Sequence, residues 1–599
     1  MIRRPPRSTL DRSSAASDVY KRQTLSVTNI FGFDLTSEKK PNVIVIMTDD
    51  QGYPELSMHG NPILKTPNLD KLGKSSVQFK NFHVTPMCAP TRGELLTGLD
   101  NAVNQLSNVS SGRSLLKSGI PTMGNIFGSN GYSTGIFGKW HMGSNYPYRP
   151  QDRGFDESVW FPSSHIGSVS DFWGNDYFDD TYERVRPGSR KGTFEKFDGY
   201  CTDVWFSEGM RFITENQKDP FFLYIATNAP HGPYKVGPEW AEPYKRKDVN
   251  NPNFFGMIAN IDHNLGLLRD HLKDLNLDEN TILIFMTDNG TSAGCKFPGL
   301  DTEPIMGFNG GMRGKKSSIY EGGHRVPFFL HWPGGGYSKG RDVETLAAHI
   351  DVLPTLADLC KLPKPDKRFD VDGLSLTPLL AGKAKSWKRN HLFLQYHGGP
   401  HHKFALGPLT NSVVMTERWR LVNTDKAEEL YDIVNDPAQR NNIVSQRPGI
   451  VKDLRTAYQS FWISVSPFLK PVAIDLGDPT ENPTVLCSQD WRPETGNPPW
   501  NFRSIKGIPK VTYPWLVNIL EAGKYRLTFR QFPKEADKKI DGVRAKIKIA
   551  GMEKVAPIPE NSKAAIFTLN LPAGITELWT YINDPVSYTH LTLPTSDLV

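Results

Sequence analysis

The chain has few cysteines and no long hydrophobic run, and each shortage excludes a class of protein. Five cysteines in 599 residues cannot form a dense disulfide scaffold, and no Cys-x-x-Cys pair suggests a zinc site. No stretch of about 18 uninterrupted apolar residues occurs, so the sequence predicts no membrane-spanning helix. Because 38% of this long chain is hydrophobic, we expect a large soluble domain and at least one further domain.

The chain also has little net charge once its two ends are set aside. The formal charge is +6, to which residues 1–23 contribute +4 and residues 586–599 contribute −1. The remaining chain therefore carries +3. So small a global charge predicts neither a nucleic-acid nor a membrane partner.

The first 23 residues also lack the apolar centre of roughly 7 to 15 residues that a signal peptide needs. One interpretation is a disordered basic tail. We favour another, that residues 1–23 and 586–599 resemble translated sequencing-adapter fragments and are non-native ends of an open reading frame from shotgun sequence. The native N-terminus, with any export signal, would then be missing.

Short apolar runs alternate with helical patterns through the first two thirds of the chain, which predicts an α/β fold with a mainly parallel sheet buried on both faces. The expected strands are Val43–Met47, Thr134–Phe137, Phe221–Ala226, Thr281–Met286 and Val326–Trp332. A helix should begin at Thr66 with Pro67 in its first turn. A second is predicted by one apolar stripe, formed by Phe254, Ile258, Ile261, Leu265, Leu268 and Leu272.

The pattern changes twice towards the C-terminus, which predicts three domains between the two ends. Residues 24–385 form the expected catalytic α/β domain, and residues 386–470 suggest a small antiparallel sheet with a closing helix. Residues 471–585 show period-2 alternation, as in Tyr525, Leu527 and Phe529 or in Val543, Ala545, Ile547 and Ile549. This alternation predicts an accessory β-sandwich-like module.

Polar side chains follow three of the predicted strands directly. Asp49 and Asp50 follow the first, Asp288 and Asn289 follow the strand at Thr281–Met286, and His231 comes shortly after Phe221–Ala226. Singly, such residues most often form turns or helix caps. Together, at the carboxyl edge of one sheet, three carboxylates and an amide supply hard oxygen ligands that suit Ca²⁺ or Mg²⁺ and do not suit zinc.

The segment Cys88-Ala89-Pro90-Thr91-Arg92, followed by Thr97-Gly98, resembles the Cys-x-Pro-x-Arg signature of the type I, formylglycine-dependent sulfatases. The family's other blocks occur in order: Asp49-Asp50, Gly138–His141, Ala229–Tyr234, Thr287–Gly290, and Lys316 ahead of Glu321–Pro327. The resemblance covers roughly residues 40 to 470. It implies the alkaline-phosphatase-like α/β fold and an arylsulfatase-like sulfuric ester hydrolase. Thr91 stands where the family most often has Ser, a replacement that keeps the hydroxyl.

The resemblance also implies the cofactors. A formylglycine-generating or sulfatase-maturating enzyme would oxidise Cys88 to formylglycine, whose hydrated aldehyde is the nucleophile. The calcium ligands would be Asp49, Asp50, Asp288, Asn289 and the modified Cys88, with Mg²⁺ as the alternative ion. Without the surrounding motif, a cysteine such as Cys88 is normally inert packing.

Five further residues match catalytic positions of the family. Arg92 and Lys139 resemble the cations that hold and activate the diol, and His141 resembles the base that takes the second proton. His231 and Lys316 resemble the sulfate-binding pair, either of which can protonate the leaving oxygen.

The sequence leaves the alcohol portion of the substrate open. We expect a sulfated carbohydrate or an aryl sulfate, because the family cleaves both with one core. The loop Tyr396–Lys403 could form the rim of the site, and Trp491, Trp500, Trp515 and Trp579 could stack on sugars, although core packing is the commoner fate of such residues. The family implies a periplasmic or extracellular location.

Two rival functions remain. A phosphoryl-transfer enzyme on the same fold is the nearer one, although such enzymes commonly present Thr or Ser as nucleophile, so that Cys88 favours sulfate. The other is a non-catalytic glycan-binding descendant of a sulfatase. Against it, every catalytic position carries the expected residue type.

Overall fold

The structure of the protein, a computed structural model, describes residues 39–598 apart from 247–248, 250, 294–307, 364–371, 384, 386, 396–410, 425, 495, 508–510, 584–589 and 592–594. The predicted tail at residues 1–23 and the loop Tyr396–Lys403 lie outside the described residues. Within the described part, no helix is both long enough and apolar enough to cross a membrane.

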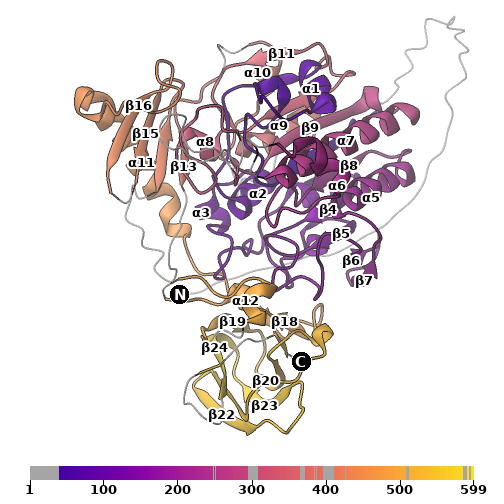
Figure 1. Ribbon diagram of the computed structural model, residues 1–599. Coiled ribbons are helices and arrows are strands. Elements are labelled where there is room, and N and C mark those ends of the chain that lie inside the picture. Colours follow the sequence, from indigo (N-terminus) through magenta and orange to yellow (C-terminus); the bar gives the residue numbers. More distant parts are fainter. Residues whose placement is uncertain are drawn as a thin grey trace, which may run out of the picture. The chain divides into compact units, whose positions relative to one another are not determined.

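A mixed, mostly parallel sheet forms the centre of the catalytic domain (Figure 1). Across the sheet its ten described strands are β11 (Arg341–Val343), β2 (Val77–Phe79), β10 (Phe328–His331), β9 (Thr281–Thr287), β1 (Asn42–Thr48), β8 (Phe221–Ala226), β4 (Ser133–Lys139), β5 (Glu157–Phe161), β6 (Thr181–Val185) and β7 (Thr193–Lys196). The five strands from β9 to β5 are parallel, and β10 runs antiparallel to β9. A separate two-stranded sheet pairs β3 (Phe82–His83) with β12 (Ala347–Ala348). The predicted α/β fold is confirmed.

Strand β1 shows why the sheet needs helices on both faces. All seven of its residues are buried, with Val43, Val45 and Met47 in one hydrophobic cluster and Ile44 and Ile46 in the other. Alternate side chains of a strand point to opposite faces, so each face of the sheet has its own core.

Helices from distant parts of the sequence cover the two faces (Figure 1). On one side lie α1 (Pro67–Lys74), α5 (Cys201–Glu215) and α7 (Pro252–Asp274), and on the other α2 (Cys88–Thr97), α4 (Met123–Gly128) and α9 (Val352–Leu359). Shorter helices are α3 (Asn101–Asn104), α6 (Pro238–Ala241), α8 (Glu321–His324) and α10 (Thr377–Leu380). The helix predicted from the apolar stripe is α7, and the helix predicted after Thr66 is α1.

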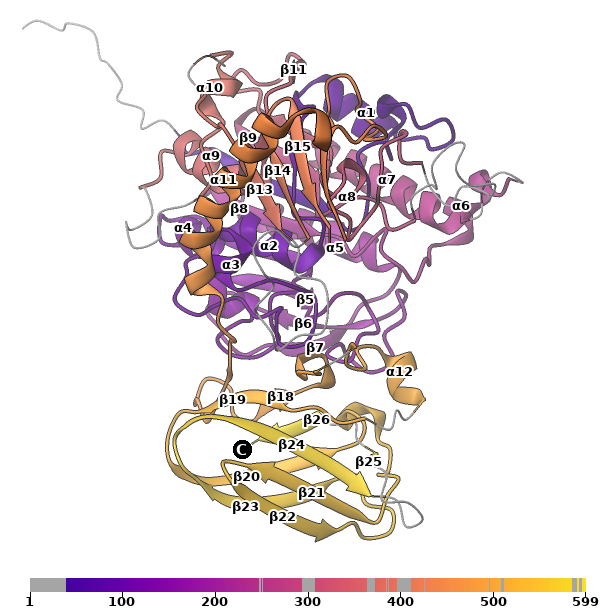
Figure 2. The ribbon, with the colours of Figure 1, turned by 90° about the vertical axis from the view of Figure 1, so that its left-hand side faces the viewer.

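A small antiparallel sheet follows the catalytic core, as predicted (Figure 2). Its strands in order are β13 (Leu392–Gln395), β14 (Ser412–Met415), β15 (Trp419–Asn423) and β16 (Glu428–Asp432), and α11 (Pro448–Val465) packs on one face. Val451, Leu454 and Tyr458 of α11 are buried against the sheet.

The C-terminal β module, residues 471–583 with the strand residues that pair with them, consists of two sheets around one core (Figure 2). One sheet contains β17 (Ile474–Leu476), β19 (Trp515–Ile519), β24 (Gly574–Asn583), β21 (Arg544–Ile549), β22 (Met552–Pro557) and β25 (His590–Leu591). The other contains β18 (Thr484–Leu486), β26 (Thr595–Leu598), β20 (Gly523–Arg530) and β23 (Ala565–Leu571), and α12 (Phe502–Lys506) precedes β19.

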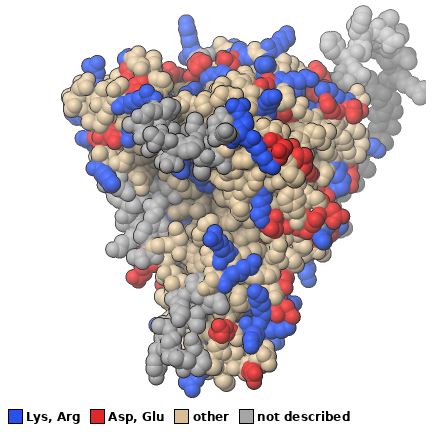
Figure 3. Space-filling view, viewed as in Figure 1, with Lys and Arg blue, Asp and Glu red and all other residues tan. Residues whose placement is uncertain are grey.

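The predicted alternation holds in this module, with one exception. Tyr525, Leu527 and Phe529 are buried, whereas Val543 is 42% exposed because it precedes the first residue of β21. Trp491 and Trp515 are buried in the module core, the commoner fate of such residues. On the face in Figure 3, basic and acidic side chains are interspersed among uncharged residues.

Candidate active site

Two strand ends bring the four predicted oxygen ligands of the metal together. Asp49 and Asp50 follow β1, and Asp288 and Asn289 follow the neighbouring parallel strand β9. The Asp50 backbone N–H donates to Asp288 Oδ1 at 3.1 Å, and Asn289 Nδ2 donates to Asp50 Oδ1 at 2.8 Å. All four side chains are buried, so this edge of the sheet holds three carboxylates out of contact with bulk water.

The oxygen atoms of this cluster fit a hard divalent cation. Asp49 Oδ1 and Asn289 Oδ1 are buried, yet neither accepts a hydrogen bond from any described residue. Possible ligand atoms of Asp49, Cys88 and Asp288 also lie within 4.8 Å of one another. Buried acceptors without donors are unfavourable, and a metal ion bound by these oxygens would compensate them.

Three cations balance the three carboxylates, Arg92 and Lys139 fully buried and Lys316 partly buried. Lys139 Nζ lies 2.6 Å from Asp49 Oδ2, Lys316 Nζ lies 2.7 Å from Asp50 Oδ1, and Arg92 contacts Asp288 Oδ2 through Nη2 at 2.8 Å and Nε at 3.1 Å. The formal charges of these six side chains sum to zero. A divalent metal would make the site positive, which favours an anionic substrate.

The pKa values of Asp49 and Asp50 shift in opposite directions in this environment. Burial raises the pKa of Asp49 well above its ordinary value, and the nearby Asp288 adds to the effect. Burial alone would also raise the pKa of Asp50, but Lys316 and His231 together outweigh it and lower that pKa. Burial would lower the pKa of Lys316, but the surrounding acidic groups, Asp50 foremost among them, together raise it well above its ordinary value, so that Lys316 stays charged.

Cys88 is the first residue of α2, where the positive end of the helix dipole adds to the cationic field. It lines a cavity of about 200 Å³, which His231 and Lys316 also line. Burial raises the pKa of the Cys88 thiol, so an unmodified thiol would stay protonated and would be a poor nucleophile at neutral pH.

His141 has a free ring nitrogen despite complete burial. Its Nε2 lies 3.0 Å from the carbonyl oxygen of Val109, an acceptor only, so Nε2 carries the proton and Nδ1 is left without a partner among the described residues. Burial lowers the pKa of His141, as does the neighbouring Lys139. The neutral ring with a bare Nδ1 can therefore accept a proton.

His231 lies between the metal-ligand cluster and the cavity. Its Nδ1 is 2.5 Å from the carbonyl oxygen of Gly232, and its Nε2 is 3.6 Å from Asp50 Oδ2. Burial lowers the pKa of His231, as does the nearby Lys316. Its ring stacks on that of His165 with centroids 5.7 Å apart.

Glycines allow two predicted site residues to lie where they do. Gly138, just before Lys139, has φ +113°, and a Cβ there would lie 2.0 Å from the carbonyl oxygen of Ala226. A Cβ on Gly290, just after Asn289, would lie 1.9 Å from the carbonyl oxygen of Gly322. There is therefore no room for a side chain at either Gly138 or Gly290.

The structure thus gathers the predicted metal ligands and cations around Cys88, while the individual roles stay predictions. It also adds cavity-lining residues that the sequence did not indicate: Ser110, Ser164, Gln489 and Asn497. Trp500 lines the same cavity, although the sequence suggested only a generic aromatic surface for it. Gln489, Asn497 and Trp500 come from the C-terminal β module, where no motif marks them.

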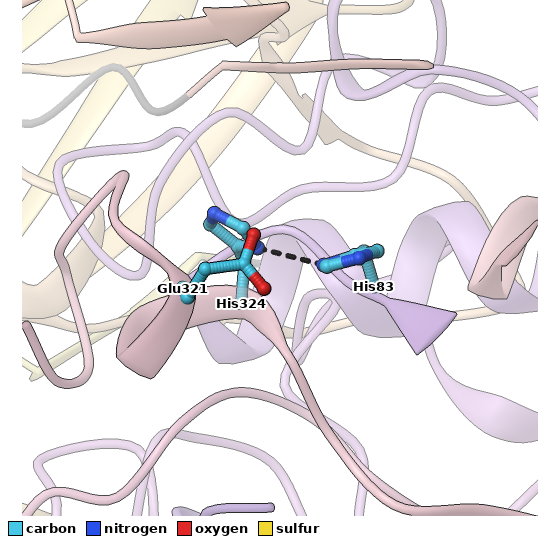
Figure 4. A group of neighbouring side chains, drawn as sticks. All are labelled: His83, Glu321 and His324. Carbon is cyan, nitrogen blue, oxygen red and sulfur yellow. Dashed lines mark hydrogen bonds between the residues drawn. The ribbon is translucent and has the colours of Figure 1, made fainter. Parts of the chain in front are cut away.

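A second cluster, His83, Glu321 and His324, could also hold a metal by the spacing of its atoms, but its hydrogen bonds already explain it (Figure 4). The Nδ1 atoms of the two histidines are 2.9 Å apart, His83 Nε2 lies 2.7 Å from Asn81 Oδ1, and Arg420 Nε donates to Glu321 at 2.7 Å. A neutral imidazole pair and a buried ion pair satisfy most of these groups without a metal.

Two family models match the chain. The model described as Sulfatase matches residues 41–362, and the model described as N-sulphoglucosamine sulphohydrolase, C-terminal, matches residues 313–459. Both matches end before the C-terminal β module begins.

Curated relatives and solved structures agree with these models. The N-acetylgalactosamine-6-O-sulfatase of Bacteroides thetaiotaomicron is 26% identical over 492 residues, which cover 71% of this chain and 93% of the relative. Human arylsulfatase A is 28% identical over 467 residues, covering 71% and 87% respectively. The crystal structure of Ps i-CgsB in complex with k-i-k-neocarrahexaose has a TM-score of 0.62 and 25% identity, covering 72% of this chain and 94% of that one. A phosphonate monoester hydrolase of Agrobacterium radiobacter, at TM-score 0.50 and 21% identity, shares the fold over 72% of this chain and 96% of its own.

Proposed function

This chain belongs to the sulfatase family and is a sulfuric ester hydrolase, and on that premise we propose that it hydrolyses a sulfate monoester of a carbohydrate through residue 88. The observation that carries the proposal is the position of Cys88. It begins helix α2 and lines a cavity, near three buried carboxylates and the three cations paired with them.

Residue 88 and a metal ion supply the chemistry that the other side chains support. Oxidised to formylglycine, residue 88 provides a hydrated aldehyde, one oxygen of which attacks sulfur while the other allows the sulfate to be released later. A Ca²⁺ ion held by Asp49, Asp50, Asp288 and Asn289 would polarise the sulfate and lower the pKa of the attacking hydroxyl.

The cations hold the reacting groups in place. Arg92 and Lys139 are anchored by Asp288 and Asp49, so their charge is fixed beside residue 88 before any substrate binds. Such preorganised charge stabilises the negative charge of the sulfuryl group during transfer. His141 takes a proton from the residue 88 hydroxyl at its bare Nδ1.

His231 and Lys316 face the alcohol side of the sulfate. Both line the cavity, and Lys316 stays charged because of Asp50. Lys316 therefore binds a non-bridging sulfate oxygen, and either residue can protonate the departing alcohol oxygen.

A carbohydrate is the substrate class that the comparisons favour. The bacterial relative is named for sulfated N-acetylgalactosamine, and Ps i-CgsB was crystallised with a neocarrahexaose. An aryl sulfate is the alternative, because arylsulfatase A is also similar to this chain. We further propose a maturation enzyme as a partner and a periplasmic or extracellular location.

Mass spectrometry of the peptide containing residue 88, after co-expression with a maturation enzyme, tests the mechanism. We expect the mass of formylglycine in place of cysteine, together with turnover of a sulfate ester that Cys88→Ala abolishes. Cysteine retained at residue 88 in a fully active enzyme would contradict the proposal.

Paired kinetics separate this function from phosphoryl transfer on the same fold. We expect the matured enzyme to have a higher kcat/KM for nitrophenyl sulfate than for nitrophenyl phosphate or a phenyl phosphonate ester. The reverse order would identify a phosphohydrolase.

A further inference from the structure

The C-terminal β module supplies one wall of the cavity that Cys88 lines. Gln489, Asn497 and Trp500 form this wall, and His231 and Lys316 line the same cavity. These three residues lie beyond residue 459, where the second family match ends. The cavity of about 200 Å³ equals the liquid volume of about seven water molecules, which suits a small cyclic group beside a sulfate.

Trp500 is held in a fixed orientation at this wall. The edge of one ring meets the face of the other between Trp500 and His165, with centroids 5.0 Å apart, and His165 in turn stacks on His231. The Trp500 carbonyl oxygen accepts a hydrogen bond from Val169 N–H at 3.1 Å. Trp500 is only partly buried, so part of its indole remains available to a ligand.

Gln489 is fixed from three sides. In the Gln489 side chain, Oε1 accepts a hydrogen bond from Ser163 Oγ, and Nε2 donates to the Val109 carbonyl at 3.3 Å. The backbone carbonyl of Gln489 accepts a hydrogen bond from Ser111 N–H at 2.8 Å. A primary amide has two N–H donors, so one remains for a ligand hydroxyl.

The two parts of the chain contribute different chemistry to the cavity lining. Among the described lining residues, the catalytic domain contributes the cationic and titratable groups Lys316, His231 and Cys88, whereas the module contributes two amides and an indole. An indole face suits the C–H face of a pyranose ring, and amides suit its hydroxyl groups.

We propose that Trp500, supported by Gln489 and Asn497, forms a subsite for the sugar ring that carries the sulfate, so that the C-terminal β module is part of the substrate site. This inference rests on the proposed function, because it assumes that the sulfate lies at residue 88. In this proposal, specificity for the alcohol portion of the sulfate ester depends on residues that neither family model covers.

Calorimetric titration of sulfated galactose and sulfated N-acetylgalactosamine tests the subsite in a Cys88→Ala background, where turnover plays no part. We expect Trp500→Ala to weaken binding of the preferred sugar about tenfold, the loss expected from one aromatic contact. Trp500→Phe should retain most of the affinity. Binding of inorganic sulfate should not change, because the ion lacks the sugar ring that the proposed subsite would hold.

Trp579→Ala is the matched control, since this tryptophan belongs to the same module but stacks on Tyr581 away from the cavity. In the matured enzyme, Trp500→Ala should raise KM for the sulfated sugar about tenfold, whereas Trp579→Ala should leave both KM and kcat within about threefold of the wild-type values. Unchanged sugar affinity in Trp500→Ala, or an equal loss for inorganic sulfate, overturns the subsite.

Different results would contradict the sugar subsite and the proposed sulfatase function. Turnover of nitrophenyl sulfate without binding of either sugar would overturn the sugar subsite and leave the sulfatase function standing. Sugar binding that depends on Trp500 in an enzyme that cleaves no sulfate ester would support the subsite and contradict the proposed function.

Discussion

Two residues of the site, Asp50 and His141, have left-handed backbone conformations that non-glycine residues rarely adopt. Their φ angles are +69° and +60°, and both follow strands of the central sheet. Such strain persists only where the surrounding structure enforces it. The sheet therefore fixes the direction of these two side chains before any ligand binds.

The unpartnered oxygens of Asp49 and Asn289 lead to a prediction about metal binding. Calcium should raise the melting temperature of the protein, and a chelator should reverse the rise, because only the folded state holds these oxygens together. Asn289→Ala should reduce the calcium-dependent shift by at least half in thermal unfolding. Asn435→Ala, at an exposed position, serves as the control. An equal calcium shift in both variants would exclude Asn289 as a ligand.

Because Gly290 lies close to the Gly322 carbonyl, we expect that adding one methyl group at Gly290 strongly destabilises the protein. Gly290→Ala should lower the melting temperature and remove the response to calcium, because the loop that carries Asp288 and Asn289 must shift. Gly449→Ala has open space and a helical position, so it should leave stability unchanged or slightly raised. Equal melting temperatures of the two variants would disprove the steric argument.

Individual side chains differ in how far the sequence could indicate them. Asp49, Asp50, Asp288 and Asn289 follow apolar runs directly, so strand ends and ligand chemistry point to them together. Gln489 has no such signal. It reaches the cavity only because a segment 380 residues after Val109 folds against it, and no local pattern encodes that contact.

Helix α2 is held in place by one buried carboxylate. Glu94 accepts hydrogen bonds from Thr85 Oγ1 at 2.5 Å and from Asn101 through its backbone N–H and Nδ2, both at 3.0 Å, and its Oε2 lies 2.7 Å from His349 Nε2. These partners come from segments on several sides of the helix. Glu94 therefore fixes the helix that carries Cys88.

Removal of this carboxylate should destabilise the protein strongly. Glu94→Ala leaves several buried donors unpaired, so we expect the free energy of unfolding to fall by about 3 kcal/mol in urea denaturation. Glu417→Ala, at an exposed position, should change it by less than about 0.5 kcal/mol. A similar small change for Glu94→Ala would show that the helix is held by packing alone.

The elements themselves were predictable where periodicity is strong. The apolar stripe of α7 and the continuous runs of β1, β8 and β9 are long enough to identify the element type. The direction of β10 was not predictable, because a short buried apolar run has the same sequence pattern in a parallel and in an antiparallel strand.

The C-terminal β module shares its core with the catalytic domain. Leu115 and Tyr148 of the catalytic domain belong to the same hydrophobic cluster as Trp491 and Trp515, and the Tyr148 hydroxyl donates to the Ala473 carbonyl at 2.8 Å. Differential scanning calorimetry should therefore show one unfolding transition for both parts. An early separate transition, absent when residues 471–599 are removed, would show that the module unfolds independently.

Glu481 makes the contact between these parts sensitive to pH. It accepts a hydrogen bond from Tyr146 N–H at 2.8 Å, and burial raises its pKa to about 7 in spite of Arg149. Between about pH 4.5 and 7, the unfolded chain loses this proton while the folded chain keeps it. Its contribution to stability therefore falls as pH rises through this range and is constant above it.

Substitution of Glu481 by glutamine, its uncharged amide, should remove this loss of stability at higher pH. Glu481→Gln should be as stable as the wild type near pH 4.5 and more stable by up to about 3 kcal/mol at pH 8, as measured by unfolding at both pH values. Glu521→Gln, at an exposed position of the same module, is the control. A difference that does not change with pH would exclude titration of Glu481 as its cause.

The burial of Cys88 has a consequence for the order of events during synthesis. Only 1% of this residue is exposed, and it begins a helix whose every residue is buried. An enzyme that oxidises it could not reach it in the finished fold, so the proposed modification would have to take place while the polypeptide is still being made or exported. The cavity wall from Gln489 to Trp500 forms later, because some 400 further residues must leave the ribosome first. The nucleophile would thus be made before the site that uses it is assembled.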